Sequence, residues 1–469
     1  MSSPFNEEKY KALLEGLEIS EVMLSEAKSI TGDARFDSEY YLKKYVHIDN
    51  LLKKKKTFPF KEYCNYVKKG IFDLPPDNYK TSGIPLIRTS EIKNPQIDFS
   101  TTVFIDEKVH LENHKTSLKS RDLVFTKIGA YIGDVAILPS IYPDYNFSQN
   151  VAGASVKDKI NSPYLLAFFL SELGKSQILR SLMLSGQGKL ELEDIRNYRI
   201  PSVSKDFKQQ VFNLFDRIEF TNTQFKSLFS KAEDILLSEL GLKDWRPNNN
   251  PVNIKQLKES FLASGRLDAE YYQSKYDALF AQLSKYECDT IKDIAHIKKS
   301  VEPGSEAYQD SGIPFVRVSD VTKFGISEPS IYLSPCDFNL NELRPKKDTI
   351  LLSKDGSVGI AYKVEEDMDC ITSGALLHLS VFNEDYTPDY LTLVLNSIVV
   401  QMQAERDSNG AIIQHWKPSE IEQVIIPKLP KPIQEIISAK IQESFALKKE
   451  SRRLLDEAKM MVEREIEKE

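Results

Sequence analysis

The residues of this sequence that come nearest to a catalytic pattern are Asp77, in a Pro-Pro-Asp-Asn turn, and the short stretch Glu91-Ile-Lys93. Together they fit the loose P-D…E-x-K pattern of metal-dependent nucleases, in which carboxylates hold Mg²⁺ and the lysine steadies the attacking water. The pattern is short and degenerate, and a turn rather than a strand carries its aspartate. We therefore interpret the match as a coincidence.

No other familiar catalytic pattern is complete. The Gly-Lys pair of Ser185-Gly-Gln-Gly-Lys189 lacks the first glycine of a nucleotide-binding loop. Asn94-Pro95 is followed by glutamine, not by the second proline and the aromatic residue of a base-amino methyltransferase. His110 and His114 have the spacing of a zinc pair, but no glutamate follows His110, and the 4 cysteines form no C-x-x-C pair. We expect a chain that is not an enzyme and has no cofactor or metal site.

Short polar turns favour binding instead. Thr126-Lys127-Ile-Gly129 and Ser353-Lys354-Asp-Gly356 each place a hydroxyl, a cation and a glycine after a predicted strand, which suits a loop that grips a phosphate. Arg88-Thr-Ser90 and Arg317-Val-Ser319 place a guanidinium at a strand end, and arginine matches guanine or phosphate. The alternative for the Ser/Thr-Lys-x-Gly motifs is a plain β-turn. The alternative for the two arginines is a salt bridge at the edge of the core. Our candidate DNA-binding residues are Tyr79, Arg88, Ser90, Thr126, Lys127, Gly129, Gln187, Tyr308, Arg317, Ser319, Ser353, Lys354 and Gly356.

Because the chain is acidic overall, any DNA-binding surface must be a local basic patch. The 469 residues carry 62 Lys+Arg against 69 Asp+Glu, a formal net charge of −7, so the chain does not bind nucleic acid through its overall charge. Residues 41–70 hold nine lysines and two acids, although a lysine run is more often a solvated face. The first ten residues are polar and acidic, and the longest apolar stretches are too short for a membrane span. We expect a cytoplasmic protein with no membrane association.

The sequence contains an internal repeat. Arg35-Phe-Asp-Ser-Glu-Tyr-Tyr41 recurs as Arg266-Leu-Asp-Ala-Glu-Tyr-Tyr272, and Tyr79-Lys-Thr-Ser-Gly-Ile-Pro-Leu-Ile-Arg88 recurs as Tyr308-Gln-Asp-Ser-Gly-Ile-Pro-Phe-Val-Arg317. The Ser/Thr-Lys-x-Gly turns and an Ile-Pro dipeptide follow in the same order and at nearly constant separation. The separation between matching motifs decreases slightly along the chain. A few loop deletions in the second copy would produce this small decrease, whereas scattered coincidences would not. We therefore predict a duplicated fold.

Within each copy the local patterns predict an α+β fold. Residues 84–88, 122–126 and 135–138 are short, β-rich and bounded by glycine, proline or aspartate, which indicates strands. Residues 163–182 and 388–403 carry helical apolar spacing and have proline near the start, which indicates helices over these ranges.

A long helix is predicted after each Ile-Pro. From Lys205 to Leu240 the apolar residues fall at heptad spacing, as in a coiled-coil strand, and Gly241 ends the helix before a loop of proline and asparagine. The predicted rows are Val211, Ile218, Phe225 and Ala232 on one side and Leu214, Leu228 and Ile235 on the other, with Thr221 as a polar interruption. The second helix, from Lys431 to Glu469, is charge-balanced with one apolar stripe, and its obvious partner is the first helix.

These duplicated motifs, their order and the helix after each Ile-Pro resemble the specificity subunit of type I restriction-modification systems, over nearly the whole chain. The resemblance implies two similar target-recognition domains, each reading one half of a bipartite site in double-stranded DNA. It also implies two long antiparallel coiled-coil helices with pseudo-two-fold symmetry, which join the domains and bind two methyltransferase subunits. The methyltransferase would supply S-adenosylmethionine and catalysis, and ATP-dependent restriction subunits would supply cleavage. The second copy differs in lacking the lysine run and in carrying Asp355 inside its turn.

The expected domain boundaries follow the repeat. They are an N-terminal helical segment 1–36, a first target-recognition domain 37–204, a central coiled-coil helix 205–242, a linker 243–265, a second target-recognition domain 266–428 and a C-terminal coiled-coil helix 429–469. Two rival hypotheses stay open: a nuclease or methyltransferase that is active on its own, and a duplicated adaptor that binds protein rather than DNA. Cleavage and methylation assays test the first, and salt-dependent binding to duplex DNA tests the second.

Overall fold

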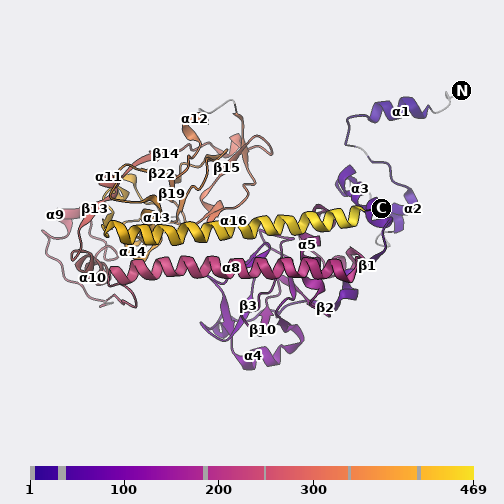
Figure 1. Ribbon diagram of the computed structural model, residues 1–469, viewed down its shortest axis with the longest axis horizontal. Coiled ribbons are helices and arrows are strands. Elements are labelled where there is room, and N and C mark those ends of the chain that lie inside the picture. The colour runs from indigo at the N-terminus through magenta and orange to yellow at the C-terminus, as the bar shows by residue number, and fades with distance from the viewer. Residues whose placement is uncertain are drawn as a thin grey trace. The chain divides into compact units, whose positions relative to one another are not determined.

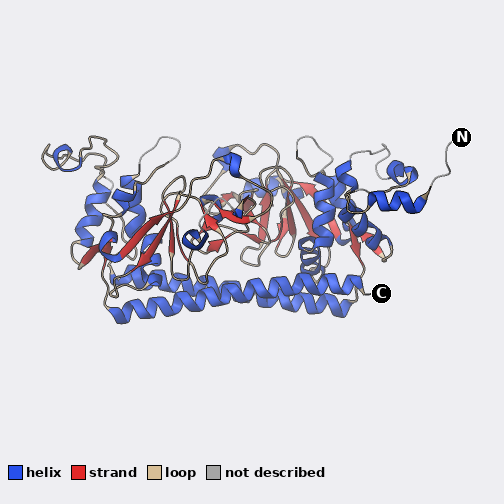
Figure 2. Cartoon of the chain, turned by 90° about the horizontal axis from the view of Figure 1, so that it is seen from above, coloured by secondary structure: helices blue, strands red, loops and turns tan. Residues whose placement is uncertain are grey.

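The structure, a computed structural model, describes residues 6–18, 20–29, 38–182, 188–247, 250–335, 340–408 and 414–468. The chain divides into two compact units, one of residues 1–221 with 450–469 and the other of residues 222–449. Each unit mixes helices with sheets, as the predicted α+β class requires (Figures 1 and 2). In the parts of the chain that the structure describes, no helix is long and apolar enough to cross a membrane.

The body of the first unit is two four-stranded sheets. Their strands are β2 Cys64–Lys69, β3 Ile84–Ile87, β6 Val103–Ile105, β7 Leu118–Lys119, β8 Leu123–Thr126, β9 Val135–Ile137, β10 Asp144–Phe147 and β11 Val151–Val156. One sheet has the order β2-β11-β8-β9 and is antiparallel, and the other has the order β6-β3-β10-β7 with β3 and β10 parallel. Two shorter pairs join β1 Thr57–Pro59 to β12 Arg199–Pro201 and β4 Ile92–Lys93 to β5 Gln96–Ile97. The predicted strands at 84–88, 122–126 and 135–138 are confirmed as β3, β8 and β9.

The helices of the first unit correct one prediction. They are α1 Glu7–Leu14, α2 Leu24–Ser29, α3 Lys43–Lys53, α4 Glu107–Glu112, α5 Asn161–Leu170, α6 Glu172–Leu182 and α7 Leu192–Asn197. The continuous helix predicted over 163–182 is wrong, because Ser171 is extended with ψ 162° and separates α5 from α6. Its hydroxyl donates to the Phe168 carbonyl at 2.6 Å, a local bond that competes with helix continuation. The turn is so tight that a Cβ on Gly174 would lie 2.2 Å from the same carbonyl oxygen.

The second unit repeats the topology of the first except for one strand of the mixed sheet. Its strands are β13 Cys288–Thr290, β14 Ala295–Lys299, β15 Ile313–Val316, β16 Val321–Thr322, β17 Gly325–Ile326, β18 Tyr332–Leu333, β19 Ile350–Ser353, β20 Ala361–Lys363, β21 Ile371–Thr372, β22 Leu376–Val381 and β23 Ile425–Pro427. The larger sheets have the orders β14-β22-β19-β20 and β18-β15-β21, with β15 and β21 parallel, and β13-β23 and β16-β17 are the short pairs. The predicted duplication is therefore confirmed, although the second unit has no described strand equivalent to β7.

The helices of the second unit repeat the same break. They are α9 Phe261–Ser264, α10 Ser274–Leu283, α11 Ile291–Ile294, α12 Leu340–Leu343, α13 Pro388–Asn396, α14 Ile398–Asp407 and α15 Pro418–Ile421. The helix predicted over 388–403 is wrong at Ser397, whose hydroxyl donates to the Val394 carbonyl at 2.7 Å and accepts from Val399 N at 3.3 Å. Ser397 thus caps α14 at its start, as serine favours.

Two long helices, α8 Lys205–Glu239 and α16 Lys431–Glu467, confirm the predicted helical segments. Gly241, with φ 61°, ends the first one, and Leu242 N donates back to the Leu237 carbonyl at 2.7 Å. Each helix contributes one segment to each unit. In the second apolar row of α8, Leu214 is buried as predicted. The row then continues through Phe229 and Leu236, with 5% and 0% exposure, and not through their neighbours Leu228 and Ile235.

Segments of α8 and α16 pack together inside each unit. In the first unit Val211 and Ile218 share a core with Ala458, and Arg217 lies 3.8 Å from Glu450. In the second unit the ring of Phe445 lies 6.4 Å from that of Phe225 and 6.5 Å from that of Phe229, and Ser444 donates to the Phe225 carbonyl at 3.1 Å. The apolar stripe of α16 is thus covered by α8 within both units.

Candidate nucleic-acid interface

The turn after β3 holds Arg88 and Ser90 around a buried carboxylate. Oε1 of Glu91, which has 0% exposure, accepts from Arg88 Nη2 at 2.7 Å and from Ser90 Oγ at 2.9 Å. Arg88 Nη2 also donates to the Thr101 carbonyl at 2.7 Å. Hydrogen bonding to Glu91 raises the pKa of Arg88. The guanidinium is therefore fixed in a salt bridge, and its side chain keeps 28% exposure toward solvent.

The turn after β15 repeats this arrangement with a shorter acid. Arg317 N donates to Asp320 Oδ2 at 2.8 Å, and Ser319 Oγ donates to Oδ1 at 3.2 Å. The guanidinium Nε is 3.7 Å from Asp320, and the side chain of Arg317 is 38% exposed. Arg317 is thus held less tightly than Arg88. Neither Glu91 nor Asp320 was predicted as a partner of its arginine. The Arg-x-Ser-acid pattern, which is present in both copies, is the sequence signal for this pairing.

The two candidate tyrosines lie just before the strands that carry the arginines. Tyr79 is half-buried and packs on the small core of Ile71, Leu86 and Ile105. The ring of Tyr308, with 37% exposure, lies 5.7 Å from that of Phe315 in β15. Both tyrosines therefore pack beside the strand that follows them and stay partly exposed.

The Ser/Thr-Lys-x-Gly turns follow β8 and β19. In the first unit a Cβ on Gly129, whose φ is 132°, would lie 3.7 Å from Thr89 Oγ1, so this turn adjoins the Arg88 turn. In the second unit Lys354 forms an ion pair with Asp355, and Gly356 has φ 74° with open space around it. Both glycines occupy backbone conformations that other residues rarely adopt. Gln187 lies outside the described residues.

The lysine run of residues 41–70 is spread over several elements rather than gathered on one face. It extends from α3 through β1 to β2. Lys61 donates to Asn197 Oδ1 at 2.9 Å, and Lys68 to the Lys115 carbonyl at 3.4 Å. Lys53 pairs with Asp49 at 3.0 Å. These contacts favour the solvated-face alternative for these three lysines.

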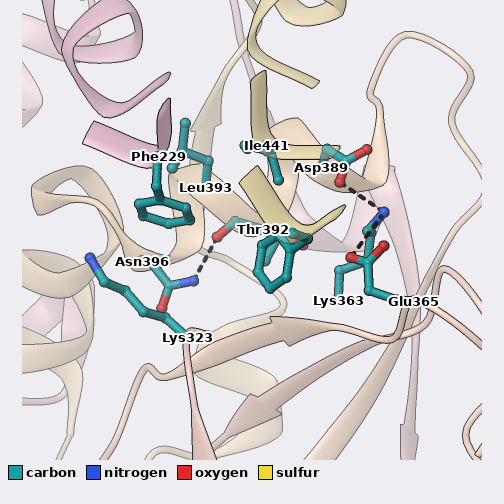
Figure 3. A pocket seen from close by; sticks show the side chains of 10 residues that line it. Phe229, Lys323, Lys363, Glu365, Asp389, Thr392, Leu393, Asn396 and Ile441 are labelled. Atoms are coloured by element: carbon teal, nitrogen blue, oxygen red, sulfur yellow. Dashed lines mark hydrogen bonds and ion pairs between the residues drawn. The ribbon is translucent and has the colours of Figure 1, made fainter. Parts of the chain in front are cut away.

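A small cavity in the second unit is closed by an ionic cluster (Figure 3). Lys363, with 7% side-chain exposure, lies 2.8 Å from Asp389 and 3.4 Å from Glu365, and Asp389 also accepts from Gln442 of α16 at 2.7 Å. The volume is about 10 Å³, about that of one water. The cluster thus fastens α13 and β20 to α16. Among the described residues no group of three or more His, Cys, Asp or Glu is placed to hold a metal ion.

Comparison with known proteins places this fold in a family. A sequence profile described as "Type I restriction modification DNA specificity domain" matches residues 52–228 and again residues 284–456. The chain belongs to this family. The specificity subunit of the type I restriction enzyme EcoBI from Escherichia coli is 23% identical over 272 residues, which are 55% of this chain and 52% of that protein. The match thus spans about half the length of the curated relative.

Solved structures of the specificity family cover most of the chain at low similarity. The S subunit of a type I restriction-modification system from M. genitalium aligns with 88% of this chain and 96% of its own length, at 14% identity and a TM-score of 0.41. The HsdS subunit from Thermoanaerobacter tengcongensis covers the same shares at 14% identity and a TM-score of 0.27. The family assignment therefore rests on the two profile matches.

The repeated Arg-x-Asp-x-Glu-Tyr-Tyr motif lies outside both ranges that match the specificity family. In the second unit Arg266 Nε donates to Asp268 at 2.8 Å, and its guanidinium lies 4.4 Å from the ring centroid of Tyr271. Arg406 of α14 lies 4.9 Å from the same ring. In the first unit Arg180 of α6 lies 3.8 Å from the ring centroid of Tyr40. Cation–π contacts of this kind fasten the segment before each sheet to a helix of the same unit.

Proposed function

We propose that this chain is the DNA-recognition subunit of a type I restriction-modification complex and is itself non-catalytic. Each repeat reads one half of a bipartite target in double-stranded DNA. The observation that carries this proposal is the duplicated fold, in which each copy matches the specificity family and carries the same arginine and lysine turns.

The two target-recognition domains of this proposal are residues 37–204 and 266–428, and α8 and α16 connect them as an antiparallel coiled coil with pseudo-two-fold symmetry. The packing of α8 on α16 within each unit supports this pairing. The coiled coil sets the length of the unread spacer and docks two methyltransferase subunits, which supply S-adenosylmethionine and the reaction. ATP-dependent restriction subunits complete the complex in the cytoplasm.

The experiment is a titration of duplex DNA with the full chain over a range of salt concentrations, alone and with the methyltransferase subunit. We expect log K to fall steeply and linearly with log salt, because phosphate contacts release counterions. We also expect methyl transfer only when the methyltransferase subunit is present. A chain that binds no DNA in either form, or that cleaves or methylates DNA on its own, would contradict the proposal.

A further inference from the structure

The lysine turn of the first repeat contains a buried hydroxyl without a partner and a largely buried lysine that no acid neutralises. Thr126 has 0% exposure, and its Oγ1 makes no hydrogen bond within the described part of the chain. Lys127 has 6% exposure, and no hydrogen bond or ion pair of its ammonium is found among the described residues. A buried cation without a carboxylate costs free energy, because most of its hydration is lost.

The same turn in the second repeat satisfies both groups internally. Ser353 Oγ donates to the Ser357 carbonyl at 2.5 Å and accepts from Ile360 N at 2.8 Å. Lys354, with 9% exposure, forms an ion pair with Asp355. Asp355 in turn lies 2.8 Å from His415 Nδ1. This turn is therefore complete without a ligand.

The difference between the two lysines follows from one sequence position beside each of them, although the first turn is one residue longer than the second. Leu190 N donates to the Lys127 carbonyl at 2.9 Å, and Trp416 N donates to the Lys354 carbonyl at 2.8 Å, so the following segments attach alike. Ile128 stands where the second repeat has Asp355. In the first repeat, Lys127 thus has no neighbouring acid of the kind that neutralises Lys354.

The charged groups that act on Lys127 are two lysines and one carboxylate. Burial, followed by the charge of Lys189, lowers its pKa, and Lys69 at the end of β2 acts in the same direction. Glu191 opposes this effect, but it already pairs with Lys189 at 2.8 Å. An anion at this place would compensate the cations, as phosphate does for clustered lysines.

We propose that Lys127, together with Lys69 and Lys189, binds a phosphate of the DNA backbone, whereas Lys354 is neutralised by Asp355 and only holds its own turn together. This inference rests on the proposed DNA-binding function and assigns different roles to two equivalent lysines. Phosphate contacts fix the position of a protein on the duplex and carry no sequence information directly. The first repeat would therefore anchor the complex more strongly than the second.

The test measures the slope of log K against log salt for the full chain on one duplex containing its target. Lys127→Gln should reduce the magnitude of this slope by about 1, the change for one lost phosphate contact, and Lys127→Arg should restore it. The matched variant Lys354→Gln should leave the slope unchanged. Asp355→Asn should free Lys354 to contact a phosphate and should increase the magnitude of the slope by up to about 1.

A second measurement uses the wild-type chain and so does not depend on how the variants fold. Acetylation of each lysine by a soluble reagent is followed by mass spectrometry with and without duplex DNA. We expect DNA to protect Lys127 and to leave the reactivity of Lys354 unchanged. DNA binding with equal slopes for all variants, or with equal protection of the two lysines, would overturn this inference and leave the proposed function standing. Absence of any DNA binding would overturn the proposed function itself.

Discussion

An acid three residues after each candidate arginine determines how that arginine can act. Glu91 holds Arg88 in a charged hydrogen bond, whereas Asp320 reaches Arg317 only at 3.7 Å. The sequence located both arginines at strand ends and shows an acid three residues after each, but it could not show how closely each acid would pair with its arginine. That pairing depends on how the turn folds back on itself, which short-range propensities do not specify.

Replacing Glu91 tests the importance of this carboxylate. Glu91→Gln should lower the free energy of unfolding by about 3–5 kcal/mol, because it leaves the guanidinium of Arg88 without its buried counter-charge. The matched change Asp320→Asn should cost about 1 kcal/mol, since Arg317 is more exposed. Denaturant unfolding of the full chain measures both. Equal losses of unfolding free energy in the two variants would contradict the conclusion that Glu91 holds its arginine more tightly than Asp320 does.

His378 provides a prediction about pH. Burial, followed by the charge of Lys298, lowers the pKa of His378 to about 4, and its Nε2 lies 2.7 Å from Thr372 Oγ1. The unfolded chain, with an ordinary pKa of about 6.5, therefore binds this proton more readily, so stability is lost as the pH falls from about 6.5 to 4. Unfolding free energies should fall more steeply with decreasing pH in wild type than in His378→Gln, by up to about 1.4 kcal/mol per pH unit. Parallel curves would refute this.

At the scale of elements, the sequence predicted where helices and strands occur better than where a helix is interrupted. The strands at 84–88 and 122–126 were predicted correctly from their β-rich, bounded sequences, and both long helices from their regular apolar spacing. The breaks at Ser171 and Ser397 were missed, because apolar spacing continues through them while the side chains cap the backbone locally. The shifted row on α8 was missed because that helix packs on a sheet domain as well as on α16.

Replacing Lys363 tests whether its ionic cluster stabilises the packing of β20 and α13 on α16. Lys363→Met should lower the free energy of unfolding by about 3–5 kcal/mol, because the buried carboxylate of Asp389 would then have no cation. The equivalent strand end of the first unit carries Ile137, and Ile137→Met should cost less than about 1.5 kcal/mol. Thermal or denaturant unfolding distinguishes the two. A loss for Lys363→Met no larger than that for Ile137→Met would show that the cluster adds no stability.

At the scale of the whole molecule, the proposed coiled coil acts as a ruler. The boundary between the units falls after Thr221 in α8 and after Lys449 in α16. Seven residues inserted at both points should lengthen each helix by about 10 Å and keep the apolar seam in register. At about 3.4 Å per base pair, the spacer should grow by up to about 3 base pairs with both half-sites unchanged. Methylation mapping of cells that carry this variant measures the spacer, and an unchanged spacer in an active variant would refute the ruler.

The central claim is that each repeat reads its own half of the target. The most direct test exchanges residues 45–200 for the matching domain of another member of the specificity family, and maps the methylated sites in a host that supplies the methyltransferase subunit. The account predicts that one half-site changes to that of the donor, while the other half-site and the spacer stay the same. A change in both half-sites together would contradict it.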